Sequence, residues 1–75
     1  MKLTLRQLEI FIAVARHENV SQAANELALS QSATSAALTE LERQFAAQLF
    51  DRLGKRMRLN ELGRAILPRA TELID

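Results

Sequence analysis

The 75-residue sequence contains no cysteine and only one histidine, His17. The chain therefore has no disulfide, no thiol nucleophile, and no zinc site built on thiolates or on a pair of histidines. It also lacks a glycine-rich phosphate loop, and no apolar run approaches the roughly 18 residues of a membrane span. Since its first residues lack the apolar core of a signal peptide, we expect a cytoplasmic protein that is not an enzyme, has no cofactor or metal and does not enter a membrane.

The chain is long enough for one domain and no more. At 48% hydrophobic residues it is too apolar for a disordered tail. Leucine and alanine, which favour helix, dominate the composition. A domain of this size without disulfides or metal depends on well-packed helices or on a partner chain, so we expect a small, mainly α fold.

The cationic residues are unevenly distributed, although the formal net charge is only +1. Residues 52–58 contain four cations and no acid, namely Arg52, Lys55, Arg56 and Arg58. A local basic patch attracts polyanions whatever the overall charge. The alternative is a strand edge that uses its cations against aggregation. We favour contact with a polyanion, because four cations without an acid exceed what edge protection needs.

Capping residues and apolar spacing predict three helices in the first part of the chain. Thr4 is expected to cap a first helix that ends near Asn19, and Ser21 to cap a short second one. Ser30 then opens a third helix over about residues 31–46. The second and third helices, joined by a tight turn, form a candidate helix-turn-helix.

The last third of the chain predicts a hairpin and a fourth helix. Gly54 separates two short, partly alternating runs within residues 49–60, which favours a hairpin with Lys55 and Arg56 at its tip. Asn60 is expected to cap the fourth helix. That helix is apolar on more than one side, so its own domain can cover only part of it. We expect two chains to pair through its surplus apolar residues, namely Leu62, Ile66, Leu67, Leu73 and Ile74.

The outward positions of the third predicted helix show a gradient of chemistry. The early ones are polar and uncharged (Gln31, Ser32, Ser35 and Thr39), whereas acids appear later, at Glu40 and Glu42. A helix that enters a DNA groove with its N-terminal end leading needs such a gradient, because hydroxyls and amides bond to base edges and acids repel phosphate. The alternative is the solvated face of an ordinary amphipathic helix.

Taken in order along the chain, these segments resemble the N-terminal domain of LysR-type transcriptional regulators. The segments that carry the resemblance are Arg6-Gln7-Leu8, Ser21-x-Ala23-Ala24-x-x-Leu27, Leu29-Ser30-Gln31-Ser32-Ala33-x-Ser35, Leu38-x-x-Leu41-Glu42, Leu49-Phe50-Asp51-Arg52 and Arg58-Leu59-Asn60-x-x-Gly63. Each match alone is weak, but the ordered set is specific and covers nearly the whole chain.

The resemblance implies a winged helix-turn-helix of three helices and a β-hairpin wing over residues 1–59. A linker and dimerisation helix over residues 60–75 would follow, and a small-molecule effector would bind only to a further C-terminal domain that is absent here. Four positions depart from the family pattern. Ser32 replaces a common proline, Ala36 and Ala37 replace an arginine and a polar residue, and Leu53 replaces a small polar residue and is expected to pack under the wing.

We therefore expect sequence-specific binding to double-stranded DNA at an interrupted inverted repeat, by a homodimer that regulates transcription. The third helix would lie in the major groove and the wing in the minor groove. The residues expected to contact DNA are Ser30, Gln31, Ser32, Thr34, Ser35 and Thr39 of the helix and Arg52, Lys55, Arg56 and Arg58 of the wing. Arg52 has an alternative as the ion-pair partner of Glu42. The competing function is a helical protein-interaction module that does not bind DNA.

Overall fold

The computed structural model describes residues 3–74, so Met1, Lys2 and Asp75, which the two expected domain ranges include, lie outside the described residues. It confirms a mainly helical fold with one hairpin. The elements in chain order are α1 (Leu5–His17), α2 (Val20–Leu27), α3 (Gln31–Phe45), β1 (Phe50–Leu53), β2 (Arg56–Leu59) and α4 (Glu61–Ile74).

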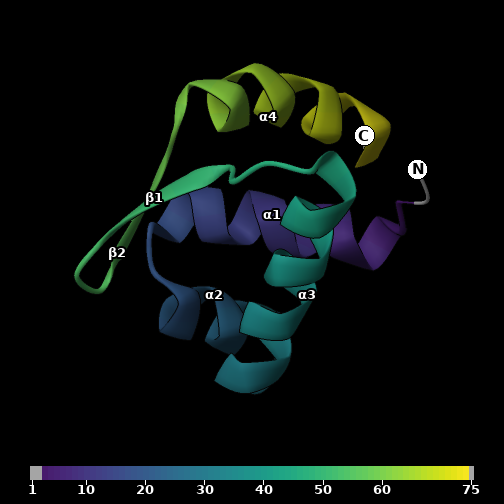
Figure 1. Ribbon diagram of the computed structural model, residues 1–75. Coiled ribbons are helices and arrows are strands. Elements are labelled where there is room, and N and C mark those ends of the chain that lie inside the picture. The colour runs from purple at the N-terminus through teal and green to yellow at the C-terminus, as the bar shows by residue number, and fades with distance from the viewer. Residues whose placement is uncertain (1–2, 75) are drawn as a thin grey trace.

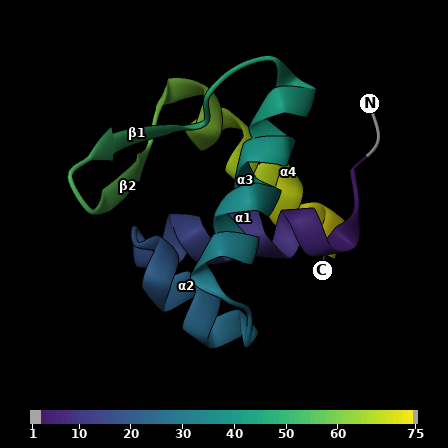
Figure 2. The same ribbon diagram turned by 60° about the horizontal axis from the view of Figure 1, so that its bottom comes forward.

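Helix α1 is the centre of the domain (Figure 1). Helix α4 lies along one side of α1, whereas α2 and α3 lie on the other, and the β1–β2 hairpin projects beside the corner between α1 and α2 (Figures 1 and 2). The core forms where these layers meet. The aromatic rings of Phe11 and Phe50 are in edge-to-face contact, with their centroids 5.7 Å apart. Both side chains are fully buried, as are Leu38 and Leu41.

Capping explains where the helices begin. Thr4 and Gln7 form the capping box of α1, and the Ser30 hydroxyl accepts the Ala33 N–H at the start of α3, as expected. The prediction for α2 is wrong by two residues. Asn19 is its N-cap and accepts the Gln22 N–H, which leaves the Ser21 hydroxyl free for another partner.

The first three helices end without glycine. Glu18, Ala28 and Ala46 each take the left-handed conformation at a helix C-cap, with φ of 54°, 57° and 54°. A side chain is costly in that region, by about 1–2 kcal/mol, so the packing of the helices imposes these turns. The turn at Glu18 also turns its carbonyl toward the hairpin, where it accepts the Met57 N–H at 2.9 Å.

The hairpin and α4 meet at the base of the wing. Gly54 has φ of 63° and provides the turn between the strands, and the register pairs Phe50 with Leu59 and Leu53 with Arg56. At the other end of the hairpin, Asn60 caps α4 by accepting the Gly63 N–H at 2.8 Å. Gly63 lies so close to the wing base that an added Cβ would be 2.2 Å from the Leu49 carbonyl oxygen.

Candidate nucleic-acid interface

The first turns of α3 present an uncharged polar surface. Gln31, Ser32 and Thr39 are exposed and Ser35 is partly exposed. None of the four carries a charge, and the carboxylate of Glu40, farther along the helix, is paired with Arg43. The four uncharged side chains thus lie at the surface as the sequence predicts, whereas Glu42, which was also expected to face outward, is buried.

Thr34 is a correction to the expected contact set. Its side chain is fully buried, and its hydroxyl donates to the Ser30 carbonyl at 2.9 Å. A buried hydroxyl is satisfied most readily by the carbonyl one turn earlier in its own helix. Thr34 therefore fixes the start of α3 from the inside, and its side chain is not accessible to a duplex.

Ser21 is the residue that the sequence interpretation missed at this surface. Its hydroxyl lies 2.8 Å from Oε1 of Gln31, to which it donates a hydrogen bond between α2 and α3. Both residues line a hollow of about 440 Å³, together with Ser35 of α3 and Arg52 and Lys55 of the wing. The start of α3 and the wing therefore flank a single concave surface. Nothing in the local sequence signals the Ser21–Gln31 contact, because ten residues separate the two.

Lys55 is an unpaired cation of the wing. It lies in the turn beside Gly54, as predicted, and is exposed. It forms no ion pair or hydrogen bond with any other residue between 3 and 74. Arg58 is exposed on β2 and also has no ion-pair partner in this range, although the register places Asp51 opposite it.

Arg56 differs from the prediction in position and partner. It begins β2 and is not in the turn. Its guanidinium pairs with the carboxylate of Glu18 at 2.5 Å, on side chains that are 63% and 39% exposed. Exposed ion pairs contribute little to stability. The guanidinium of Arg56 can therefore leave this carboxylate at little cost and pair with another anion.

Arg52 adopts the structural alternative. Its guanidinium is 2.9 Å from the carboxylate of Glu42, and the other oxygen of that carboxylate accepts the Leu49 N–H at 2.7 Å. The side chain of Glu42 is 9% exposed and that of Arg52 46%. This contact ties the C-terminal half of α3 to β1 and holds the wing against the helix.

Two alanines and one leucine are among the departures from the family pattern. Ala36 is exposed and Ala37 is partly buried against the core. The prediction that Leu53 packs under the wing is wrong, since its side chain is 56% exposed at the end of β1. Leu53 pairs across the hairpin with Arg56, beside the glycine turn, where the core no longer reaches.

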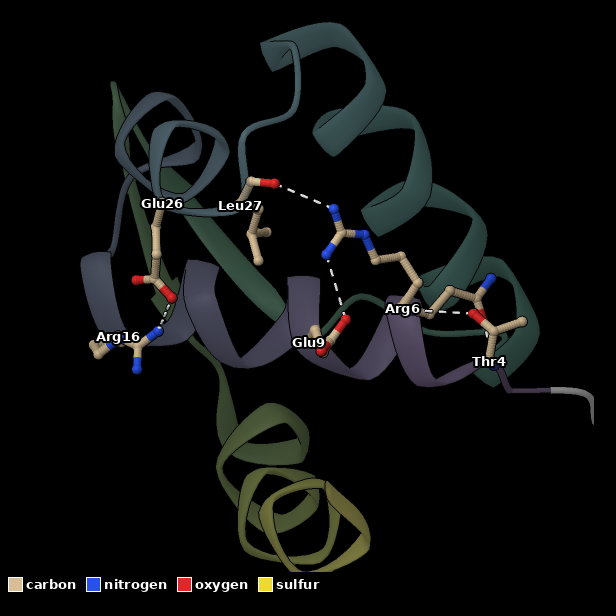
Figure 3. A network of polar contacts seen from close by, with 7 residues as sticks. Thr4, Arg6, Glu9, Arg16, Glu26 and Leu27 are labelled. Atoms are coloured by element: carbon tan, nitrogen blue, oxygen red, sulfur yellow. Dashed lines mark hydrogen bonds and ion pairs between the residues drawn. The ribbon is translucent and has the colours of Figure 1, made fainter. Parts of the chain in front are cut away.

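Arg6 joins α1 to the end of α2 (Figure 3). Its guanidinium donates to the Leu27 carbonyl at the end of α2 and pairs with Glu9. In the same view, Arg16 pairs with Glu26 of α2, and His17 contacts the other oxygen of that carboxylate. These contacts join α1 to α2.

The apolar residues of α4 divide into two groups. Ile66, Leu67 and Ile74 pack partly buried against the core, whereas Leu62 and Leu73 are 40% and 69% exposed. Of the five residues expected to pair two chains, the structure therefore leaves chiefly Leu62 and Leu73 accessible. Helix α4 continues without interruption past Pro68.

Within residues 3–74, no three histidine, aspartate or glutamate side chains are grouped as a metal site. No helix in the same range is long and apolar enough to cross a bilayer.

Comparison with known proteins gives matches along nearly the whole chain. Residues 5–64 match the family described as "Bacterial regulatory helix-turn-helix protein, lysR family". All 75 residues align at 56% identity with the uncharacterized HTH-type transcriptional regulator YeiE of Escherichia coli K12, of which the chain spans 26%.

The similar solved structures include complexes with DNA. The fold matches a "CbnR_DBD-DNA complex" with a TM-score of 0.92 at 32% identity, over 96% of this chain and 83% of that one. It also matches a "BenM_DBD/benA site 1 DNA Complex" with a TM-score of 0.91 at 26% identity, over 96% and 84% of the two chains. The fold is therefore that of a LysR-type winged helix-turn-helix domain.

Proposed function

The chain belongs to the lysR family of bacterial helix-turn-helix regulatory proteins, and from this premise we propose that residues 1–59 bind double-stranded DNA for the regulation of transcription. Its relatives are transcriptional regulators, not enzymes. The chain spans about a quarter of the length of the regulator with which it aligns over all 75 residues, so regulation by the whole protein is part of the proposal.

The observation that carries the proposal is the shared concave surface between α3 and the wing. Gln31 and Ser35 line one side of it, and Lys55 lines the other. Uncharged hydrogen-bonding groups at the start of a helix suit base edges in the major groove. The free ammonium of Lys55 suits the phosphates or the minor groove beside them. A surface that is neutral on one side and cationic on the other fits a duplex better than it fits a protein partner.

Salt dependence tests DNA binding most directly. The chain is titrated with a mixed-sequence duplex at about 50 and 200 mM salt, and affinity should fall steeply as salt displaces the contacts to phosphate. A pure protein-interaction module has no such dependence on a duplex. Affinity that is absent, or equal at both salt concentrations, would contradict the proposal.

The role of α3 is tested by Gln31→Ala, with Gln48→Ala as the matched control because Gln48 is an exposed glutamine outside the helix. Gln31→Ala should weaken specific binding by about 1–3 kcal/mol and relax one base position. The control should leave both unchanged. An equal loss of affinity for specific and random duplexes would show that Gln31 does not read a base.

We further propose that residues 60–75 join two chains. The support is the exposed pair Leu62 and Leu73 on α4, since two-fold pairing buries the same apolar patch on both chains. A dimer of this kind presents two α3 helices to one duplex, which predicts an interrupted inverted repeat. The other three residues expected at the contact, Ile66, Leu67 and Ile74, pack against the core and would hold α4 in position for this pairing.

Sedimentation of the complex with a two-site duplex tests the pairing. Leu73→Glu should reduce cooperative binding of two chains, whereas Thr71→Glu, at an exposed polar position of the same helix, should not. Both positions are exposed, so neither change removes core packing. Undiminished cooperativity in Leu73→Glu would exclude this face of α4 as the contact.

A further inference from the structure

The hydrogen bond between Ser21 and Gln31 has a consequence for base recognition. A glutamine amide has an acceptor end, the oxygen, and a donor end, the NH₂ group. An unrestrained glutamine presents both ends, and it bonds adenine by donating to N7 and accepting from N6. A glutamine whose oxygen is already engaged presents mainly its donor end.

The structure engages the oxygen. The Ser21 hydroxyl donates to Oε1 of Gln31 at 2.8 Å, while Nε2 has no hydrogen-bond partner within residues 3–74. Gln31 is exposed at the surface that faces the hollow between α3 and the wing. The donor end of the amide is thus the free end of this side chain.

Electrostatics favours the same orientation. Ser21 is the second residue of α2 and Gln31 the first residue of α3, so the contact lies between the first turns of two helices. The unpaired backbone N–H groups there create a positive potential. That potential favours the partly negative amide oxygen over the partly positive NH₂ group on the inner side.

We propose that Ser21 is a positioning residue that makes Gln31 a donor toward DNA, and that Gln31 therefore selects a base with a carbonyl oxygen in the major groove, guanine or thymine. Guanine offers O6 and N7, and thymine offers O4, all of them acceptors. Cytosine presents only a donor, and adenine presents an amino group beside N7, for which the outward side of Gln31 has no acceptor. The inference rests on the proposed function, because it requires α3 to lie in the major groove.

Selection from a randomised duplex library tests the inference with the 75-residue chain. The base position read by Gln31 is the one at which Gln31→Ala loses its preference. At that position the unchanged chain should favour guanine or thymine over adenine and cytosine on one strand, by about five- to tenfold. Ser21→Ala should reduce this ratio below about twofold by freeing the amide to turn, whereas Ser21→Thr, which keeps the hydroxyl, should retain it.

Two further variants separate positioning from folding. Gln31→Glu keeps an oxygen for Ser21 but turns a second acceptor outward, so preference should invert to the amino bases, adenine and cytosine. Gln48→Ala removes an exposed amide outside α3, and it should leave the preference at the position read by Gln31 unchanged. Thermal unfolding of each variant should match the unchanged chain, since all three positions are exposed.

The outcomes distinguish this inference from the function beneath it. A preference for adenine or cytosine in the unchanged chain, or an unaltered preference in Ser21→Ala, overturns the role of Ser21 while DNA binding stands. The inference is also overturned if the chain selects a sequence in which no position depends on Gln31. If the chain binds no duplex, or binds every sequence with the same affinity, sequence-specific recognition is overturned and this inference falls with it.

Discussion

The start of α3 and the wing face the same hollow but are built on opposite principles. The helix start is uncharged, and its geometry is fixed from the inside, by the Ser30 cap and the buried hydroxyl of Thr34. The wing is cationic and is anchored mainly at its base, where Glu42 holds both the Leu49 N–H and Arg52. Its far end is a glycine turn with the free cation Lys55.

This contrast in charge and anchoring predicts separate roles for the two regions in DNA binding. Short, rigidly placed hydrogen-bonding groups discriminate between bases, since their geometry leaves few alternatives. A flexible cation at the end of a hairpin contributes affinity that depends on salt and little on sequence. Changes at the helix start should therefore alter specificity, and changes at the wing should alter the salt slope.

The largest expected effect is on the base of the wing, through Gly63→Ala. The added Cβ would lie 2.2 Å from the Leu49 carbonyl oxygen and 2.8 Å from the Leu59 side chain, so α4 or the hairpin must shift. We expect a loss of about 3 kcal/mol in the free energy of unfolding, measured by urea denaturation. Gly54→Ala is the control at the open end, where no atom lies within 4 Å and only the positive φ opposes the change. It should lose about 1 kcal/mol, and equal losses would contradict this account.

The anchor between α3 and the wing is tested by Glu42→Ala. This change leaves the buried Leu49 N–H without its acceptor and Arg52 without its partner. The free energy of unfolding should fall by about 2 kcal/mol. Glu40→Ala, on the same helix, removes exposed contacts with Arg43 and Gln44 and should lose less than about 0.5 kcal/mol. A similar small loss in both variants would show that Glu42 does not hold the wing.

The division of work is tested by Lys55→Ala. The slope of log affinity against log salt should decrease by about one unit, because one contact to phosphate is lost. The base preferences selected from a random library should stay the same. A changed preference with an unchanged slope would reverse the roles assigned to the wing and the helix.

A smaller effect is expected from Glu18→Gln, which releases Arg56 from its carboxylate partner. Duplex affinity at low salt should rise about two- to threefold, since an exposed ion pair is worth at most about 1 kcal/mol. Glu9→Gln removes an equally exposed acid, which pairs with Arg6 on α1 and not with a cation of the wing, and should change affinity less. Lower affinity in Glu18→Gln would mean that the carboxylate holds Arg56 in its binding position.

The smallest effect concerns pH and the contact between α1 and α2. A hydrogen bond from His17, together with the charge of Arg16, lowers the pKa of Glu26 below its usual value of 4.5. A carboxyl group with a depressed pKa in the folded state stabilises the fold above pH 4.5, and this contribution is lost as the pH falls through the folded pKa. Urea midpoints between pH 6 and pH 3 should therefore fall slightly more in the unchanged chain than in Glu26→Gln. Parallel curves would contradict the linkage.

Local patterns were sufficient for most of the fold. Thr4, Ser30 and Asn60 cap the helices that they were expected to cap, because a capping hydroxyl or amide acts on N–H groups two or three residues away. Gly54 marks the hairpin turn for a similar local reason. The error at Ser21 has a local cause as well, since Asn19 is an equally good cap placed two residues earlier.

The candidate site was less accessible to the same reasoning. The sequence shows residues 52–58 as four cations without an acid. Folding places Glu18 beside Arg56 and Glu42 beside Arg52. Two of the four positive charges in residues 52–58 are therefore offset by carboxylates from other parts of the chain. Likewise, the two apolar sides of α4 could not be assigned to core and surface until α1 was in place against one of them.

The amino-acid sequence was enough to predict the helices, the hairpin, the polar start of α3 and the family to which the chain belongs. The packed structure was needed to show which cations are paired, that Thr34 is buried, and that Ser21 donates to the oxygen of Gln31. The physical reason is the range of the interactions. Capping, helical periodicity and turn formation act over a few residues. The ion pairs of Arg52 and Arg56 and the hydrogen bond between Ser21 and Gln31 join groups that are 10 or 38 residues apart, and they exist only once the elements have packed.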